Sequence, residues 1–219
     1  MPESAVPESA VPEDSLAPET GGLVLGQDGL ARCPWVTSAQ VYLAYHDTEW
    51  GRVVHGEHAL FERLTLEAFQ SGLSWLTILR KREAFRRAFA GFDPERVATF
   101  TDVDRDRLLA DGQIVRNRAK IDAAITNARA VLELRNGPGL DAFLWSFAPD
   151  PSTRPVPQRI SDVQATTPES VALSKALKAA GFVFVGPTTA HAGMQACGLV
   201  DDHLAGCCAR SSSDPVPGT

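Results

Sequence analysis

His58-Ala-Leu-Phe-Glu-Arg-Leu-Thr-Leu-Glu-Ala-Phe-Gln70 is the stretch of sequence that decides the fold. Apolar residues recur in it at positions 60, 61, 64 and 68, which lie on one face of an α-helix. A second stretch with the same pattern runs from Ser74 to Phe89, and its apolar positions are Leu76, Leu79, Phe85 and Phe89. This periodicity predicts amphipathic helices whose apolar faces pack against one another.

Capping residues predict where other helices begin and end. Asp93-Pro94 combines an N-cap with a proline at the first helical position. A longer amphipathic pattern covers residues 117–134, and Thr167-Pro168-Glu169 begins another helix, which Gly181 ends. β-Branched runs such as Phe182-Val-Phe-Val185 are too few to build a sheet. The sequence therefore predicts an all-α fold in a single multi-helix domain.

Length and composition predict one globular domain between two tails. The chain has 219 residues, of which 44% are hydrophobic and 22% are charged. The first 28 residues begin with an imperfect Pro-Glu-Ser-Ala-Val repeat, and they hold six acidic residues but no Lys or Arg. Such a composition buries too little apolar surface to fold. We expect disordered tails at residues 1–28 and 210–219 and a folded domain at residues 29–209.

The net charge does not identify a partner by itself. The formal charge of −6 comes from the first 28 residues, because the rest of the chain has as many acidic residues as the 21 Lys and Arg residues. Two basic patches, within residues 80–87 and 116–120, either contact phosphate or are solvated helix faces. No apolar run is long enough to cross a bilayer and the N-terminus lacks the features of a signal peptide, so we expect a cytoplasmic protein.

Four residues of the kind that bind metals lie near the two ends of the predicted domain. Twelve residues separate Cys33 from His46, and three separate His203 from Cys207. Together they form a Cys2His2 set, which typically holds a structural zinc ion. The alternative is two unrelated pairs with buried thiols, since neither half matches a standard zinc finger. Four protein ligands leave no position for a catalytic water, so a zinc ion here would join the N- and C-terminal segments structurally.

Glu67 lies on the apolar face of its helix, three residues after Leu64. A buried carboxylate is costly, so Glu67 either caps or bridges inside the core or performs a task. Trp75 follows a helix break at residues 71–74 that can turn its indole toward Glu67. More aromatic residues precede them in the chain, namely Trp35, Tyr42, Tyr45 and Trp50. These side chains form either ordinary core or a slot in which a planar ligand stacks.

Five motifs resemble the DNA-3-methyladenine glycosylase I family. They are Cys33-Pro-Trp-Val36, Tyr42-Leu-Ala-Tyr-His-Asp-Thr-Glu-Trp-Gly51, Leu66-Glu-Ala-Phe-Gln-Ser-Gly-Leu-Ser-Trp75, Phe182-Val-Phe-Val-Gly-Pro-Thr-Thr189 and Met194-Gln-Ala-Cys-Gly-Leu-Val-Asp-Asp-His203. The resemblance runs over residues 32–208 in the same order and spacing. It implies a helix-hairpin-helix glycosylase that hydrolyses the N-glycosidic bond of 3-methyladenine in DNA, and therefore a role in base-excision repair of alkylation damage.

The resemblance also implies a role for individual residues. One structural zinc ion would be held by Cys33, His46, His203 and Cys207. Glu67 would be the catalytic hydrogen-bond acceptor of a base pocket, in which Tyr45 and Trp75 bracket a flipped base and Trp35 lies close by. The partner would be double-stranded DNA that contains an alkylated purine. We expect a monomer without an obligate protein partner and without a membrane partner.

A few positions depart from the family pattern or need a second interpretation. The hairpin Asp111-Gly112-Gln113 has its glycine one place early, which bears on its phosphate contacts. His191 and Gly193 replace the tyrosine and phenylalanine usual before Met194, and we expect them to alter one wall of the pocket. Asp141 is the local candidate for an aspartate that supports a sugar cation, but we interpret it as the N-cap of a helix that continues with Ala142.

Two other functions compete with the glycosylase. A non-catalytic, zinc-stapled nucleic-acid-binding domain would not need a carboxylate such as Glu67 on an apolar stripe beside Trp75. A zinc hydrolase would need an open coordination position, which a set of four protein ligands lacks. Both features favour the glycosylase over its competitors.

Overall fold

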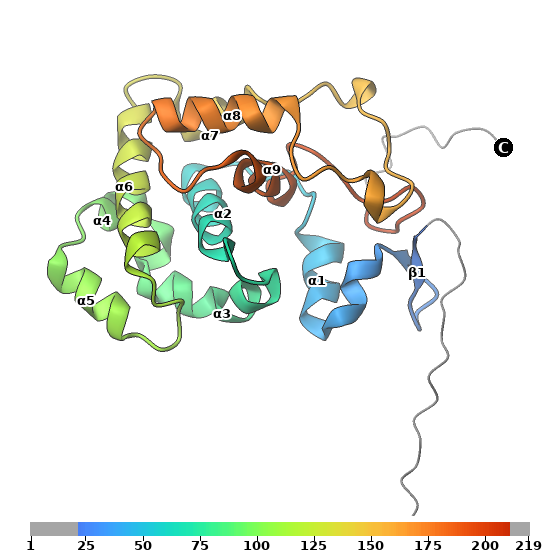
Figure 1. Cartoon of the computed structure of the whole chain (residues 1–219), viewed down its shortest axis with the longest axis horizontal. Coiled ribbons are helices and arrows are strands. Elements are labelled where there is room, and N and C mark those ends of the chain that lie inside the picture. The colour runs from blue at the N-terminus through green and yellow to red at the C-terminus, as the bar shows by residue number, and fades with distance from the viewer. Residues whose placement is uncertain (1–21, 211–219) are drawn as a thin grey trace, which may run out of the picture.

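The computed structural model describes residues 22–210, and most of this stretch is helical (Figure 1). Its α-helices are α1 (Gln40–Thr48), α2 (Glu57–Gln70), α3 (Trp75–Ala88), α4 (Pro94–Ala98), α5 (Asp102–Ala110), α6 (Arg118–Leu134), α7 (Gly139–Trp145), α8 (Pro168–Ala179) and α9 (Pro187–Ala196). Its short 3-10 helices are η1 (Pro34–Ser38), η2 (Ala90–Phe92), η3 (Pro151–Thr153) and η4 (Ile160–Asp162). None of the helices in residues 22–210 is both long and apolar enough to cross a membrane.

Side-chain hydrogen bonds confirm the predicted N-cap of α4 and the predicted start of α8, and they cap α6 as well. Each cap oxygen accepts from a backbone N–H in the first turn of its helix: Asp93 from Glu95 (2.9 Å), Asn117 from Lys120 (3.1 Å) and Thr167 from Ser170 (3.2 Å). Gly181 follows the end of α8 with a φ of +90°, a conformation that favours glycine. Local capping chemistry therefore sets the bounds of α4, α6 and α8.

A pair of two-residue strands, β1 (Val24–Leu25) and β2 (Ala31–Arg32), departs from the predicted all-α fold. The strands are antiparallel, with Val24 opposite Arg32. Because β1 lies within residues 1–28, the predicted N-terminal tail extends too far into the chain. The segment is folded because Leu23 packs against the buried residues near the C-terminus and Asp28 forms an ion pair of 2.7 Å with Arg32.

The rest of the predicted tails lies outside the described residues. Residues 1–21 carry five of the six acidic residues assigned to the N-terminal tail, and residues 211–219 make up most of the C-terminal one. Arg210, the first residue of the predicted C-terminal tail, is folded, since its Nη1 donates to the carbonyl oxygen of Asp201 at 3.3 Å. The domain therefore extends at least one residue beyond its predicted end.

Helix α2 lies in the middle of the helical body and contacts α3, α4, α6, α7 and α9. Its predicted apolar face is confirmed, because Leu60, Phe61 and Leu64 are all buried. Phe69 at its end meets Phe85 of α3, with ring centroids 4.7 Å apart. Each such side chain contributes roughly 1.5–3 kcal/mol when it is fully buried. The same helix carries Glu67, so the core holds that carboxylate in place.

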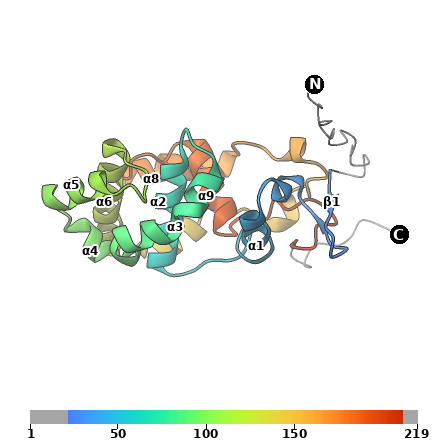
Figure 2. The same cartoon turned by 90° about the horizontal axis from the view of Figure 1, so that it is seen from below.

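The segment that precedes α2 packs against the end of the described chain as well as against α3 of the helical body. Figures 1 and 2 show β1, α1 and the last described residues on one side of the molecule. Two backbone hydrogen bonds of 2.8 Å join these segments to their neighbours, from Cys208 N to Ala31 O and from Ala205 N to Pro157 O. Parts of the chain that are far apart in sequence therefore form a second, smaller body.

Residues 51–54 connect the two bodies and lie against the end of α9. Gly51 N donates to Gln195 O, and Val54 N donates to Cys197 O, both at 3.0 Å. Gly198 makes this approach possible, because it has a φ of +72° and a Cβ there would lie 2.4 Å from the carbonyl carbon of Arg52. A residue with a side chain would push the connecting segment away.

We expect Gly198→Ala to destabilise the protein more than Gly139→Ala does. Both glycines have a positive φ, 72° and 73°, so alanine costs about 1–2 kcal/mol at either position. A Cβ on Gly139 has no neighbour within 4 Å, whereas at Gly198 it displaces backbone, which adds about 1–3 kcal/mol. Urea unfolding of both variants measures the difference. Equal free energies of unfolding would contradict the close approach at Gly198.

Candidate functional site

A cavity of about 460 Å³ lies where η1, α1, α2, α3 and α9 meet. It is lined by Trp35, Ser38, Tyr42, Tyr45, Trp50, Glu67, Gln70, Trp75, Ala192 and Gln195. Two further cavities, of about 320 and 480 Å³, both include Arg154 and contain no aromatic side chain. The aromatic cavity is therefore the one suited to a planar ligand, and it contains every residue predicted for the pocket.

The aromatic side chains of the cavity form a connected wall. Tyr45 and Trp75 face each other with ring centroids 5.3 Å apart and an interplanar angle of 46°. Trp35 packs edge-on against Tyr42 at 5.5 Å and against Trp50 at 5.2 Å. Such π-faces accept a planar and positively charged ligand well, because the ring quadrupole is negative above its face.

Glu67 is the one carboxylate in this wall, and it is only 5% exposed. Among the described residues, no group donates a hydrogen bond to it. Burial raises the pKa of its carboxyl group to about 8, and the nearby Arg63 guanidinium lowers it only in part. Arg63 itself is bound to Glu49, with Nη2 3.0 Å from Oε2. The carboxyl group in the empty cavity is therefore mostly protonated at neutral pH.

A buried lysine holds the loop that presents Trp75. Lys120, near the start of α6, is 7% exposed, and its Nζ donates to Phe69 O at 2.8 Å and to Ser71 O. These are carbonyl oxygens at the end of α2, where a positive charge is favourable. Ser74 then caps α3 by accepting from Thr77 N at 3.3 Å. Lys120 was predicted within a basic patch that faces phosphate or solvent, and its burial contradicts both.

The first basic patch mostly binds protein groups. Lys81 Nζ donates to the carbonyl oxygens of Gly112 and Gln113, and Arg87 donates to the Gln113 side chain at 2.9 Å. Arg82 and Arg86 form ion pairs with glutamates. Lys81 and Arg87 therefore hold the turn between α5 and α6 against α3. The hairpin glycine stands one place early in this sequence, at Gly112. Neither Gly112 nor Gln113 adopts a positive φ, so this shift places no strain on the turn.

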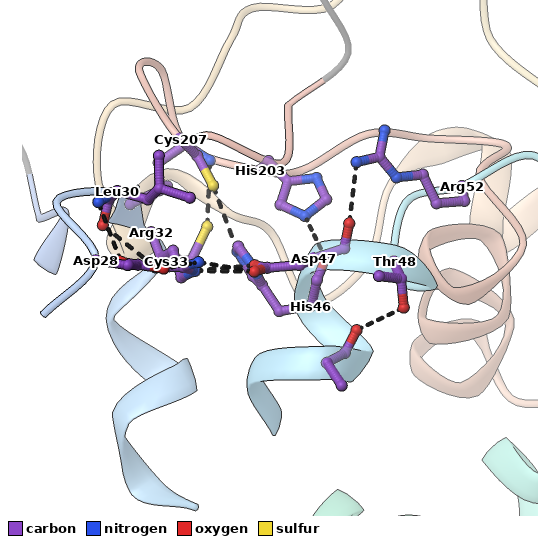
Figure 3. Close-up of polar contacts among 12 residues, drawn as sticks. Asp28, Leu30, Arg32, Cys33, His46, Asp47, Thr48, Arg52, His203 and Cys207 are labelled. Carbon is purple, nitrogen blue, oxygen red and sulfur yellow. Dashed lines mark hydrogen bonds and ion pairs between the residues drawn. The ribbon is translucent and has the colours of Figure 1, made fainter. Parts of the chain in front are cut away.

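A buried cluster of Cys33, His46 and Cys207 lies beside the cavity, where the start of the chain meets its end (Figure 3). One donor atom from each residue lies within 4.8 Å of the others. Cys207 Sγ is 3.3 Å from His46 Nε2, and hydrogen bonding from Cys33 and His46 lowers the pKa of the Cys207 thiol. Thiolate sulfur and imidazole nitrogen at this spacing are the donors that a zinc ion prefers.

His203 is next to this cluster but is not one of its three converging donors. Its Nε2 lies 3.4 Å from the carbonyl oxygen of His46, and the two imidazole rings are 4.7 Å apart. In both histidines the Nδ1 atom lies 2.7 Å from an aspartate oxygen, of Asp47 and Asp201 respectively. Carboxylates that bind Nδ1 orient the ring and leave Nε2 for a metal, so the four residues fit a Cys2His2 centre.

The cluster and the cavity share a wall. The ring of Trp35 is 5.1 Å from that of His46, and the ring of Trp50 is 4.6 Å from that of His203, both in edge-on contact. Arg32 supports the same region, with Nε 3.0 Å from Asp47. Any change in the position of the two histidines therefore reaches the aromatic wall directly.

Three of the positions that needed a second interpretation lie outside the cavity. His191 and Gly193 do not line it, and the expected change of its wall stays a prediction. His191 is part of α9, and its Nε2 lies 3.3 Å from Asp202 Oδ2. Asp141 does not cap its own helix but lies in the first turn of α7, where its carboxylate accepts from Gly56 N at 2.6 Å and contacts His55. It caps the chain that enters α2 instead.

Two glutamines of the cavity, Gln70 and Gln195, were not among the predicted site residues. Gln70 ends the helix of Glu67, and Gln195 lies within the last of the five motifs. Helical spacing offered a signal for Gln70, because it follows Glu67 by three residues. No comparable pattern marks Gln195, since its position depends on how α9 packs.

Comparison with known proteins finds relatives over almost the whole described chain. The methyladenine glycosylase family model matches residues 35–210. The chain is 46% identical over 187 residues to DNA-3-methyladenine glycosylase 1 of Escherichia coli (strain K12), covering 85% of this chain and 100% of the relative. A crystal structure of 3-methyladenine DNA glycosylase I has a TM-score of 0.77 and 45% identity, and the match covers 82% of this chain and all of the other. A structure concerned with 3-methyladenine recognition, that of 3-methyladenine DNA glycosylase I from Staphylococcus aureus, has a TM-score of 0.77, 38% identity and coverage of 84% and 98%.

We expect Glu67→Gln to become progressively more stable than the wild type as the pH rises from 5 to 8. The wild-type carboxyl has a pKa of about 8 when folded and an ordinary value near 4.5 when unfolded. Its raised pKa therefore contributes stability that is full below pH 4.5 and is lost as the pH rises through 8, by on the order of a few kcal/mol. Glutamine does not titrate. Melting temperatures of both proteins from pH 5 to 9 test this, and a constant difference would contradict the burial of an unpaired carboxyl.

Proposed function

This chain belongs to the methyladenine glycosylase family, and we propose that its aromatic cavity receives a 3-methyladenine base rotated out of double-stranded DNA. The protein is a DNA-repair glycosylase, a hydrolase that acts on the N-glycosidic bond of the damaged base. The single observation that carries the assignment of the cavity is Glu67, a buried carboxyl without a hydrogen-bond partner among the described residues, in a wall of aromatic rings. Rotating a base out of the stack costs a few kcal/mol, which contacts in such a pocket offset.

The chemistry needs little from the protein. Methylation at N3 gives the purine a positive charge, so the base leaves with the electron pair of the glycosidic bond as a neutral molecule. Water then adds to C1′ of the sugar and loses a proton. The contribution of the pocket is to bind the cationic base and to exclude bulk water from it.

The protonation state of Glu67 supports the selection of a cationic base over a neutral one. Without a ligand the carboxyl is mostly neutral, because it is buried and Arg63 compensates its charge only in part. A cationic base brings the missing charge and favours the carboxylate, and the resulting charge-assisted hydrogen bond is about twice as strong as a neutral one. Undamaged adenine brings no charge and gains much less. The faces of Tyr45 and Trp75 favour the cation in the same direction.

The turn between α5 and α6 is our candidate for the main contact with the DNA backbone, as a helix-hairpin-helix element. Its support is the exposure of residues 116–119 just before and within the first turn of α6, where free N–H groups favour an anion. Lys81 and Arg87 hold this turn against α3, and Lys120 connects the same helix to the loop before Trp75. A backbone phosphate bound there would therefore be connected to the base pocket through Lys120 and the loop before Trp75. Cytoplasmic location and a monomeric state stay predictions from the sequence.

The competing function is a nucleic-acid-binding domain without catalysis. It would use the turn between α5 and α6 but not the cavity. The presence of Glu67 in the same cavity as Tyr45 and Trp75 favours the enzyme, because a binding module has no use for a costly buried carboxyl. Release of free base from DNA distinguishes the two functions directly.

We expect Glu67→Gln to slow single-turnover excision of 3-methyladenine by about ten- to a hundredfold, which corresponds to roughly 1.5–3 kcal/mol for a lost charged hydrogen bond. Glutamine keeps the shape of the side chain but cannot become an anion. Glu62→Gln is the matched control on the same helix, since Glu62 pairs with Arg86 and does not line the cavity. Wild-type excision by folded Glu67→Gln would show that Glu67 is structural.

We also propose that Cys33, His46, His203 and Cys207 hold one structural zinc ion. The support is the buried convergence of three donors, the carboxylates on both imidazoles and the adjacency of His203. With four protein ligands the ion would supply folding energy and no reactive water. Its effect on function would pass through Trp35 and Trp50, which pack against the two imidazoles.

We expect Cys207→Ser to lose zinc and Cys208→Ser to retain it. The two cysteines are neighbours in sequence, but Cys207 is buried in the cluster whereas Cys208 is exposed. Metal analysis of the purified proteins should find about one zinc per chain in the wild type and in Cys208→Ser, and chelation should lower the melting temperature of both. Folded, active wild type without zinc would refute the proposal.

A further inference from the structure

Gln195 is the one side chain of the cavity whose amide is held by a carboxylate behind the wall. It lies near the end of α9, and its Nε2 donates to Asp202 Oδ2 at 2.9 Å. Among the described residues, no group hydrogen-bonds its Oε1 atom. Because Gln195 lines the cavity, Oε1 is the polar atom of this side chain that remains for a ligand there.

The orientation of this amide follows from the charge of Asp202. Asp202 is 5% exposed, and Arg154 Nη2 donates to its Oδ1 at 2.9 Å. His191 Nε2 lies 3.3 Å from Oδ2. The guanidinium of Arg154, which forms an ion pair with Asp202, favours the ionised carboxylate. An ionised carboxylate only accepts, so the amide must turn its NH2 group toward Asp202 and cannot present it to the cavity.

We propose that Gln195 selects bases with an amino group at position 6, and that Asp202 is the positioning residue that keeps its Oε1 an acceptor. This inference rests on the proposed function of the cavity. The amino group of 3-methyladenine offers two N–H donors, and Glu67 and Gln195 are two of the side chains of the cavity that offer acceptors. Methylated guanine carries a carbonyl oxygen at position 6, which would face an acceptor without a hydrogen between them.

The expected discrimination has the size of a lost polar contact. A site built to bind one hydrogen-bonding group rejects the analogue that lacks it, because the buried partner is left unpaired. Glutamine gives this selectivity only if its amide cannot flip, since a rotated amide would donate to a carbonyl equally well. The contact with ionised Asp202 prevents that rotation. A neutral partner at position 202 would allow it.

Two variants test the inference on full-length protein. Asp202→Asn replaces the acceptor-only carboxylate with an amide that pairs with either orientation of Gln195. Gln195→Met keeps the length of the side chain and removes the acceptor. Each protein is incubated with double-stranded DNA treated with a methylating agent, and the released 3-methyladenine and 3-methylguanine are separated by chromatography. We expect the ratio of their single-turnover rates to fall by about tenfold in both variants.

Asn127→Ala is the control for stability. Asn127 lies outside the cavity and bonds the backbone of Val183 through both atoms of its amide, so its loss weakens the fold without touching Gln195. In Asn127→Ala, the ratio of the release rates of 3-methyladenine and 3-methylguanine should equal that of the wild type. If Asp202→Asn does not fold, the ratio of the two release rates in Gln195→Met alone tests the inference. A wild-type ratio in Gln195→Met would overturn the inference, whereas a wild type that releases no 3-methyladenine would overturn the proposed function instead.

Discussion

The contact between the start and the end of the described chain is the constraint on which the rest of the structure depends. Cys33 and His46 meet Cys207 in a buried cluster, although His46 and Cys207 are 161 residues apart in sequence. Closing so long a loop costs entropy, which a few hydrogen bonds offset only in part. The same contact places Trp35 and Trp50 against imidazole rings and thereby completes one wall of the cavity. The cavity lies where the segment that holds η1 and α1 meets α2, α3 and α9 of the helical body.

Local sequence patterns predicted those features that depend on one element at a time. Helical periodicity identified the buried face of α2 and the extent of α6, and capping residues identified the starts of α4 and α8. The placement of Glu67 beside Trp75 also followed from spacing and a helix break. Motif resemblance supplied the family, and the cavity contains the pocket residues which that resemblance implied, although their roles await experiment.

Features that depend on packing between distant elements were not predictable in this way. Lys120 belongs to a run of basic residues, and only the end of α2, about fifty residues earlier in sequence, makes it a buried cap. Asp141 was predicted as an N-cap, but it lies in the first turn of α7 and binds the start of α2. β1 lies in a polar segment, and it forms because the C-terminal residues provide a surface for Leu23. In each case the deciding partner lies elsewhere in the chain.

Several buried polar groups lack a hydrogen-bond partner, and one of them belongs to Trp75, which lines the cavity, so that stability and function are connected there. Trp75 Nε1 is buried without a hydrogen-bond partner, as are Nη1 of Arg63 and Oγ1 of Thr65 on the helix of Glu67. Each such group costs about 1–3 kcal/mol of stability. A ligand that supplies charge and hydrogen-bonding groups at this place lowers that cost, so part of its binding energy comes from the instability of the empty site. A tightly packed apolar wall would be more stable and would lose the ability to distinguish a cationic base from a neutral one.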